Sequence, residues 1–482
     1  MKSKINMQER FTEQQYEQMI DALFHRFPSF QKVGAGAYKP GLGNMEFIDQ
    51  LLGHPHRKYK IVHVAGTNGK GSVSNMLASA LSALGYKVGL YTSPHILDFR
   101  ERIRVCYPEP SCCHTGSEGA VSLIHKQDVW NFVNQWQDTF DHVDMSFFEI
   151  TTAMALQWFA DQEVDYVVLE TGLGGRLDST NIVTPVLSVI TNIGLDHCDL
   201  LGETLQEVAF EKAGIIKPRV PVVVGESSVE TDAVFERKVL YTNLPEPLYM
   251  GNRSAIMSLL TFADKSEPNL WESSEDMLAK MDLRGDYQRK NLRTVLAALQ
   301  VLSGLEEGFA TFDEVRCKKV SDAIINTAKR TGFRGRWEQV CDNPRIICDI
   351  GHNEHGLKYN FAQLERLKAS GECTHLIVVY GSVADKDLNA VLPLMPTEAE
   401  YVFTQANGKR ALTADLVMQC FNEFCVESDR QPVGVYCCAD VVSAVSKARG
   451  LASEILDANP SAKPLIYIGG STYVVSEAVA VM

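Results

Sequence analysis

The residues best suited to chemistry in this 482-residue chain form a glycine-rich run. The run Gly66–Ser72, GTNGKGS, follows an apolar β-branched segment and leads into a helical pattern. Glycines let backbone N–H groups turn inward, the start of a helix adds positive potential, and Lys70 can reach terminal phosphates. The spacing departs from the common GxxxxGK(S/T) pattern, so a plain glycine-rich turn is the alternative. The run predicts a site for nucleotide phosphates.

Three further polar side chains stand where short apolar runs end, namely Ser93, Glu170 and His197. Because the carboxyl ends of parallel strands meet at one edge of a sheet, we expect these groups beside the phosphate site. A hydroxyl, a carboxylate and an imidazole there suit Mg²⁺, with phosphate oxygens and water completing its shell. A structural hydrogen-bonding role is the alternative for His197.

The elements that must position these groups are β-branched runs alternating with helical patterns. Near-continuous apolar runs suit strands buried on both faces of a parallel sheet, with helices as crossovers. They occur in two sets, and the strands we expect are 59–64, 88–91, 165–170, 186–190, 220–224, 345–349, 375–379, 400–403 and 464–468. Helical patterns at 287–302 and 313–329 separate the sets. We therefore expect two α/β domains, 1–331 and 332–482, the first the larger.

Composition excludes several classes of protein. Hydrophobic residues make up 45% and charged residues 22%, which is ordinary for a globular chain. The net charge of −14 argues against a protein that mainly neutralises nucleic-acid phosphates. No apolar stretch is long enough to span a bilayer, and the N-terminus reads as an amphipathic helix rather than a signal peptide. We expect a cytoplasmic monomer with no nucleic-acid or membrane partner.

Twelve cysteines are scattered along the chain without a CxxC pair, so we expect reduced thiols rather than a disulfide framework. A Pro/Gly/Ser-rich stretch could bind a soft metal through Cys112, Cys113, His114 and His125. Zinc-type spacing is absent there, and a surface loop is the interpretation we favour.

A series of motifs in a fixed order carries a family resemblance. GTNGKGS, TSPH, LETGLGGRLDSTN, GLDH and EKAGIIK are followed by YQRKN, GRW, DIGHN and ADKD, over nearly the whole chain. In this combination the sequence resembles the folylpolyglutamate synthase/dihydrofolate synthase family of the Mur ligase superfamily. The resemblance implies an N-terminal P-loop ATPase domain of the Mur ligase type with a mostly parallel sheet, and a smaller C-terminal Rossmann-like α/β domain that serves glutamate ligation.

The resemblance also implies an activity. Family members are ATP-dependent ligases that add L-glutamate to dihydropteroate and to (poly)glutamyl tetrahydrofolate through an acyl phosphate, releasing ADP and phosphate. The partners implied are ATP, L-glutamate, dihydropteroate and reduced folates, with two Mg²⁺ ions as cofactors. The alternatives are a monofunctional folylpolyglutamate synthase, a cell-wall Mur-type ligase, a simple P-loop kinase and a catalytically silent ATP-binding protein. Joint presence of Glu170, His197 and Lys212 speaks against a silent protein, because a binder needs no second metal ligand.

Residue by residue, the resemblance assigns ATP binding to Gly69, Lys70, Gly71, Ser72, Asn291, Arg336 and Asp349. It assigns one Mg²⁺ to Ser93 and Glu170, and the second to His197 with a carbamylated Lys212. The catalytic residues it implies are Lys70, Lys212 and His197, and its pterin-side positions are Phe148, Glu149, Leu177 and Asp178.

Some of these positions have simpler interpretations. By its residue type alone, Lys212 reads as a solvated lysine on a helix. Phe148 fits core packing and Glu149 a charge at a helix start. No glutamate-binding residue is assigned, and the segments of first interest are Asp385–Lys386 and Gly470–Ser471. The loop Tyr107–Lys126 is longer and richer in Pro, Ser and Cys than is typical of the family, but it holds no predicted ligand.

Overall fold

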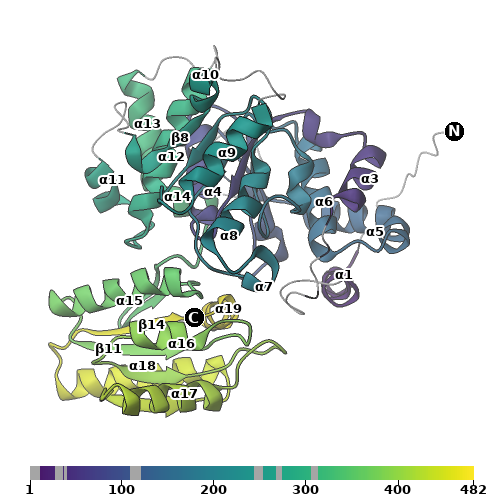
Figure 1. Cartoon of the computed structure of the whole chain (residues 1–482). Helices are drawn as coiled ribbons and strands as arrows, with labels where there is room; N and C mark the ends of the chain where they lie inside the picture. The colour runs from purple at the N-terminus through teal and green to yellow at the C-terminus, as the bar shows by residue number, and fades with distance from the viewer. Residues whose placement is uncertain are drawn as a thin grey trace.

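The computed structural model describes residues 11–27, 36, 39, 41–108, 121–243, 253–266, 274–305 and 313–482. They form two α/β domains, which lie one above the other in Figure 1. Of the sequence-predicted soft-metal group, Cys112, Cys113 and His114 lie outside the described residues, and His125 precedes helix α5. The cysteines that the structure describes are free thiols.

Among the described residues, eight strands form the sheet of the first domain. In order across the sheet they are β4 (Val121–Leu123), β3 (Ile103–Cys106), β2 (Val88–Tyr91), β5 (Tyr166–Glu170), β1 (Lys60–Ala65), β6 (Leu187–Ile190), β7 (Val222–Val224) and β8 (Leu260–Phe262). The strands from β2 to β8 are parallel, whereas β3 and β4 form an antiparallel edge. The carboxyl ends of the parallel strands therefore share one edge.

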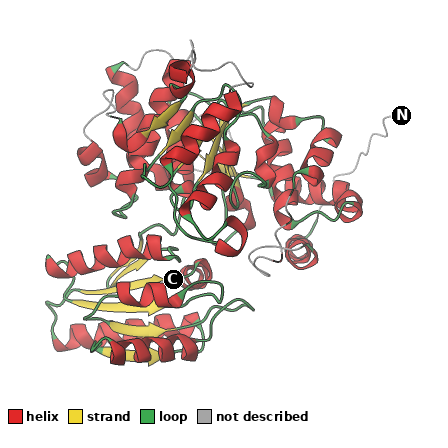
Figure 2. Cartoon of the chain, viewed as in Figure 1, coloured by secondary structure: helices red, strands yellow, loops and turns green. Residues whose placement is uncertain are grey.

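The second domain has a sheet of six strands among the residues that the structure describes. Across the sheet they are β13 (Gly434–Cys437), β12 (Glu400–Phe403), β11 (His375–Tyr380), β14 (Pro464–Gly469), β10 (Arg345–Cys348) and β9 (Glu338–Asp342). All neighbours are parallel except β9, which pairs antiparallel with β10. Figure 2 shows the sheet of this domain between helices above and below it.

Helices cover both faces of each sheet. Those of the first domain are α1 (Glu13–Arg26), α3 (Gly43–Leu51), α4 (Lys70–Ala83), α5 (Lys126–His142), α6 (Phe147–Asp161), α7 (Cys198–Leu201), α8 (Leu205–Lys212), α9 (Asp232–Asn243), α10 (Arg253–Met257), α11 (Ser274–Lys280), α12 (Gln288–Leu305), α13 (Glu314–Ile325) and α14 (Thr327–Thr331). Those of the second domain are α15 (Glu354–Ala369), α16 (Leu388–Val391), α17 (Ala414–Glu427), α18 (Val441–Ala458) and α19 (Thr472–Ala480).

Short 3₁₀ helices join several of these elements, namely η2 (Pro55–Arg57), η3 (Phe99–Arg102), η4 (Ser179–Ile182), η5 (Ala213–Ile215), η6 (Ala263–Lys265) and η7 (Leu392–Leu394). Of them, η4 follows the loop after β5 and bears on the site described below.

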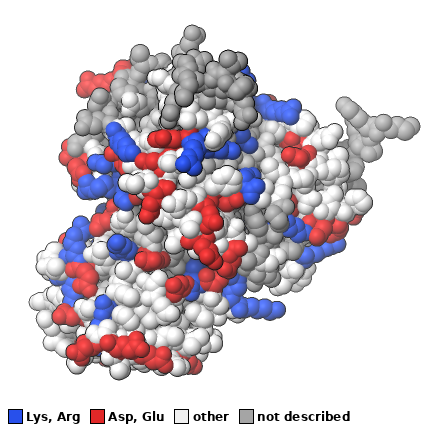
Figure 3. Space-filling view, viewed as in Figure 1, with Lys and Arg blue, Asp and Glu red and all other residues white. Residues whose placement is uncertain are grey.

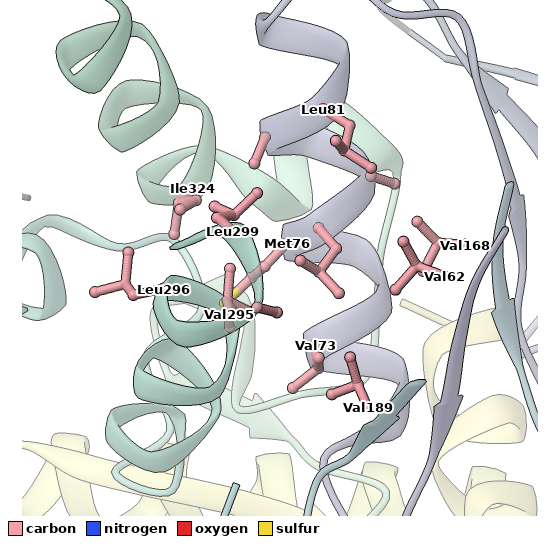
Figure 4. Close-up of a cluster of buried hydrophobic side chains, with 14 of the residues drawn as sticks. Val62, Val73, Met76, Leu81, Val168, Val189, Val295, Leu296, Leu299 and Ile324 are labelled. Atoms are coloured by element: carbon pink, nitrogen blue, oxygen red, sulfur yellow. The ribbon is translucent and has the colours of Figure 1, made fainter. Parts of the chain in front are cut away.

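Helix α4 is buried on every side and fixes the position of the glycine-rich run. It packs with Val73 and Met76 between the sheet, at Val62, and helix α12, at Val295 (Figure 4). A helix that is buried all round belongs in a core, and each of its larger apolar side chains contributes roughly 1.5–3 kcal/mol on burial. The loop before α4 is therefore attached to the most deeply buried helix of the domain.

All nine strands expected from the sequence are present, and their ends shift by no more than two residues. The sequence-based prediction omitted β3, β4, β8, β9 and β13, which are short, and β3, β4 and β9 are antiparallel. Their half-exposed or brief runs carry little apolar signal. The boundary predicted at Gly332 stays a prediction; it falls between the two sheets, where Gly332 ends α14.

No helix among the described residues combines the length and the apolar character needed to cross a membrane. On the face drawn in Figure 3, basic and acidic side chains of the described residues lie interspersed.

Candidate active site

The phosphate loop connects β1 to α4 and depends on its glycines. Gly69, at the N-cap of α4, has φ of 84°, a left-handed conformation that side chains with a Cβ rarely adopt. A Cβ there would lie 2.3 Å from Asn291 Oδ1, so glycine also admits Asn291 from α12. The first N–H groups of α4 lack intrahelical partners and lie beside a cavity that residues 66–72 line. The N-terminal end of α4 is therefore suited to binding an anion.

Two lysines share one carbonyl oxygen at this loop. The Nζ atoms of Lys70 and Lys212 both donate to the oxygen of Gly66, at 2.9 and 3.0 Å. Lys212 ends α8 and is 3% exposed, so it is not a solvated helical lysine. Burial, and then the charge of Lys70, lower the pKa of Lys212 to about 7. Burial also lowers the pKa of Lys70. Two positively charged groups this close repel each other, and a bound anion would offset that repulsion.

Glu170 stands at the end of β5, on the same edge of the sheet. Its side chain is buried and accepts a hydrogen bond from the backbone N–H of Ser93 at 3.4 Å. Burial raises the pKa of Glu170 to about 7, although the positive charges of Lys70 and Arg336 oppose the shift. No described residue forms a salt bridge with Glu170. A buried, unpaired carboxylate of this kind is suited to a cation that arrives with the substrate.

His197 begins α7 and lines the same cavity. Burial lowers the pKa of His197 to about 3, so the imidazole is neutral and its unprotonated nitrogen can bind a cation. Among the described residues, no three His, Cys, Asp or Glu side chains form a complete metal cage. Ser93, Glu170 and His197 instead offer a partial shell, which fits Mg²⁺ because that ion keeps water and substrate phosphate oxygens among its ligands.

Asp196, next to His197, joins the two domains and was not predicted from the sequence. It forms a buried ion pair with Lys386 and accepts a hydrogen bond from Asn353 Nδ2 at 2.9 Å. Asn353 and Asn68 also exchange two amide hydrogen bonds of 3.1 Å, so the phosphate loop itself contacts the second domain. Burial would raise the pKa of Asp196, but His352, His197 and Lys386 outweigh it and hold this pKa well below its usual range.

Asp349 follows β10 and is a second junction between the domains. Its Oδ2 accepts from the Tyr287 hydroxyl at 2.6 Å and from the Trp337 N–H at 2.7 Å. Its Oδ1 accepts from the Gly351 N–H and from Asn360 Nδ2, both at 2.7 Å. Each oxygen of Asp349 therefore already has two donors, and the carboxylate holds the end of β10 against the start of α12.

A cavity of about 340 Å³ lies between the two domains and brings most of the sequence-predicted residues together. From the first domain they are Gly69, Lys70, Gly71, Ser72, Ser93, Phe148, Glu170, Leu177, Asp178, His197, Lys212 and Asn291. From the second domain they are Arg336, Asp349, Lys386 and Ser471. Within this set, Ser72 Oγ accepts a hydrogen bond from Gln288 of α12 at 3.1 Å. Arg336 lies over the ring of Phe333, with 5.3 Å between its Cζ atom and the ring centre.

The predicted pterin residues divide into two kinds. Phe148 and Leu177 line the cavity with apolar surface. Glu149 is not among the lining residues; it is buried, its carboxylate accepts from the Ser146 N–H at 2.6 Å, and Ser146 caps the start of α6 in return. Asp178 lies at the cavity, but its carboxylate serves backbone and hydroxyl donors of its own loop. A helix-capping role thus accounts for Glu149.

Other lining residues were missed by sequence reasoning. Their positions in the sequence could have indicated three of them, because Asn68, Asn192 and Asp196 lie within or beside predicted motifs. Arg102 and Arg410 also line the cavity with their guanidinium groups, and no motif marked them. Arg410 is held by Asp385 in a two-bond ion pair of 2.6 and 2.7 Å.

Comparisons with known proteins match both domains of the chain to one family of ligases. The family model described as the Mur ligase middle domain matches residues 134–299, and that of the Mur ligase glutamate ligase domain matches residues 335–456. A dihydrofolate synthase/folylpolyglutamate synthase of Bacillus subtilis is 33% identical over 377 residues, covering 76% of this chain and 80% of the relative.

Two solved structures share the fold. The Escherichia coli FolC structure in complex with DHPP and ADP has a TM-score of 0.71 at 24% identity, covering 97% of each chain. The Yersinia pestis bifunctional enzyme complexed with AMPPNP and a Mn ion has a TM-score of 0.70 at 23% identity, also over 97% of each chain. These likenesses extend over both domains.

Proposed function

The chain belongs to the dihydrofolate synthase/folylpolyglutamate synthase family of Mur ligases, and on that premise we propose that it adds L-glutamate both to dihydropteroate and to (poly)glutamyl tetrahydrofolate. It is an ATP-dependent ligase. One observation supports the proposal most: a single cavity is lined by the phosphate loop, by the apolar surface of Phe148 and Leu177, and by basic groups of the second domain.

The reaction asks this cavity for two steps. In the first, a carboxylate oxygen of the pterin substrate bonds to the γ-phosphorus of ATP, and the bond from that phosphorus to the β-phosphate oxygen breaks, releasing ADP. Lys70, which rests on backbone carbonyls at the mouth of the loop, is positioned to neutralise charge on the transferring oxygens. On binding ATP, Lys70 would exchange two hydrogen bonds to neutral carbonyls for stronger, charge-assisted hydrogen bonds to phosphate oxygens.

In the second step, the amine of glutamate attacks the acyl phosphate carbon, a C–N bond forms, and phosphate leaves with the C–O electron pair. We assign the incoming glutamate to Lys386, Arg410 and Ser471, which line the cavity from the second domain, because two cations and a hydroxyl suit carboxylates. Water must be kept out, since it would hydrolyse the acyl phosphate. The contacts of Asn353 and Asp349 across the domains support a closed cavity.

Two Mg²⁺ ions belong to this proposal. Ser93 and Glu170 would hold one, and His197 the other, and the ions would supply positive charge at the phosphate oxygens. The donor set fits, because it leaves most coordination positions to phosphate and water. We further propose that Lys212 is carbamylated. Its neutral amine would bond to the carbon of CO₂ and lose a proton, which replaces one of two crowded ammonium groups by an anion beside the second ion.

The experiment measures glutamate incorporation with dihydropteroate and with tetrahydrofolate in separate assays, each with Mg-ATP, using the wild type and Lys70→Ala. We expect the wild type to be active on both substrates and Lys70→Ala to lose both activities together. Activity on tetrahydrofolate alone would reduce the protein to a monofunctional folylpolyglutamate synthase. Loss of only one activity in Lys70→Ala would refute a shared centre.

A further inference from the structure

A chain of hydrogen bonds runs beneath the cavity from the middle of strand β1 to the loop after β5. His63 Nε2 lies 2.8 Å from Thr180 Oγ1, and that hydroxyl in turn bonds to Asp178 Oδ1. His63 and Thr180 are fully buried, and Asp178 is 4% exposed. Neither His63 nor Thr180 lines the cavity, so neither takes part in the chemistry proposed above.

The hydrogens in this chain can be assigned by counting. Asp178 Oδ1 accepts from the N–H and the hydroxyl of Thr180, and Oδ2 accepts from the N–H groups of Gly172 and Leu173, both at 2.8 Å. With two donors on each oxygen, Asp178 acts purely as an acceptor. The single hydroxyl hydrogen of Thr180 therefore points to Asp178, and the bond between Thr180 and His63 must use a hydrogen on Nε2 of the imidazole.

His63 is consequently a neutral donor with its proton on Nε2. Burial lowers its pKa to about 3, and the charge of Lys217 acts in the same direction. Its Nδ1 has no hydrogen-bond partner among the described residues, which is a cost for a buried polar atom. An apolar side chain of similar size would fill the same place in β1 without that cost. The hydrogen bond to Thr180 is thus the property that distinguishes His63 from its apolar neighbours in the strand.

The other end of the chain of hydrogen bonds meets the pterin side of the cavity. The N–H groups that Asp178 holds belong to the turn directly after Glu170. Gly172 in that turn lies against the ring of Phe148, because a Cβ at Gly172 would come within 2.5 Å of Phe148 Cζ. Gly172, Leu173 and Phe148 all line the cavity. The position of the Gly172–Leu173 turn therefore affects the position of the apolar surface that Phe148 presents to the cavity.

We propose that His63 is a positioning residue for the pterin substrate: through Thr180 and Asp178 it holds the Gly172–Leu173 turn against Phe148. This inference rests on the proposed function. The phosphate loop has its own supports, since α4 is buried on all sides and Asn291 packs at Gly69. Loss of the His63–Thr180 bond should therefore weaken pterin binding much more than ATP binding.

The test compares Thr180→Val, which keeps the shape and removes the hydroxyl, with Thr180→Ser, which keeps the hydroxyl. Thr327→Val is the matched control, because Thr327 is also fully buried, donates one hydrogen bond of 2.7 Å to a backbone oxygen, and lies away from the cavity. The KM values for dihydropteroate and ATP are measured separately, together with melting temperatures. We expect Thr180→Val to raise the KM for dihydropteroate about tenfold and the KM for ATP less than about twofold.

Two further readouts separate positioning from general packing. His63→Leu removes the bond to Thr180, and Thr180→Val removes that bond together with the one to Asp178, so the double variant should show about the same KM for dihydropteroate as Thr180→Val alone. Nitrogen NMR of ¹⁵N-histidine-labelled wild type should find His63 protonated on Nε2 and bare on Nδ1 from pH 5 to 8. Thr180→Ser should recover most of the wild-type KM.

Several results would overturn the inference. A proton on Nδ1 of His63 contradicts the assigned hydrogens, whatever substrates the enzyme accepts. Equal rises in the two KM values, or the same response in Thr180→Val and Thr327→Val, would show a packing role only. A wild type that joins glutamate to neither pterin would instead refute the proposed function, so the two failures are distinguishable.

Discussion

The two walls of the cavity handle charge differently. On the first-domain wall, Glu170 and Lys212 are buried and Lys70 is half-buried, and none of them forms a salt bridge with another described residue. On the second-domain wall, Lys386 and Arg410 are each paired with an aspartate. Unpaired buried charge is costly, and ligand phosphates and cations are what would offset it. A paired charge is held in a fixed orientation: Asp196 of the first domain holds Lys386, and Asp385 of the second domain holds Arg410. The difference separates groups left without a charged partner from groups that a partner orients.

The strongest test of this difference between the walls removes a charged group from the first-domain wall. Lys70→Ala should lower turnover by a hundredfold or more, since it removes transition-state stabilisation of about 3 kcal/mol. The melting curve should stay unchanged, because the hydrogen bonds of Lys70 to described residues go to two carbonyls of its own loop. Lys265→Ala, which breaks an exposed ion pair with Asp232, is the control and should leave turnover unchanged. Near-normal turnover in Lys70→Ala would contradict the assignment.

Acid should weaken the first domain through His63. Above pH 6.5 the imidazole is neutral in the folded and the unfolded chain. Below it the unfolded chain takes up a proton that the folded chain excludes, because burial lowers the folded pKa to about 3. Stability should therefore fall as the pH drops from 6.5 toward 3, by roughly 2 kcal/mol at pH 5 from this residue. Chemical unfolding at pH 7 and pH 5 measures this, and His63→Leu should show a smaller difference; an equal difference in both would contradict it.

The second-domain wall can be tested at Asn353. Asn353→Ser keeps an oxygen to cap α15 but removes the bonds to Asn68 and Asp196. We expect the KM for ATP to rise by about tenfold, with a smaller change in kcat, because the closed arrangement loses three hydrogen bonds between the domains. X-ray scattering should show a larger radius of gyration without nucleotide. Unchanged KM and radius would mean that these contacts do not hold the domains together.

The smallest effect concerns Glu149. Glu149→Ala should reduce stability by about 1 kcal/mol, since it removes the reciprocal cap of α6. Glu149→Gln, which can make the same cap, should be nearly as stable as the wild type. Neither change should alter the KM for dihydropteroate by more than about twofold. A large rise in this KM with Glu149→Gln would restore the role in pterin binding that the sequence resemblance assigned to it.

The first-domain wall was the more predictable from sequence because its groups come from short, continuous motifs. GTNGKGS lies between a strand and a helix, and Glu170 ends a further parallel strand, so the topology alone brings these together. His197 was expected at a strand end, but it reaches the cavity from the loop after β6, and the run 193–196 before it is not a strand. Antiparallel edges such as β9 were missed because an exposed short strand has no apolar run. The family resemblance placed Asp178 and Glu149 on the pterin side, but residue type did not reveal that their carboxylates accept hydrogen bonds from local backbone donors.

By itself, then, the amino-acid sequence determined the phosphate loop, the parallel strands and the residues at their ends, because these depend on local patterns of glycine, apolar and charged residues. Only the tertiary structure decided which carboxylates face the cavity, that Asp196 meets Lys386 across the domains, and that His63 reaches Thr180, more than a hundred residues away in the chain. Such pairings depend on distances and directions in space. No local pattern encodes those, since a buried histidine reads the same in the sequence whether or not a hydroxyl stands beside it.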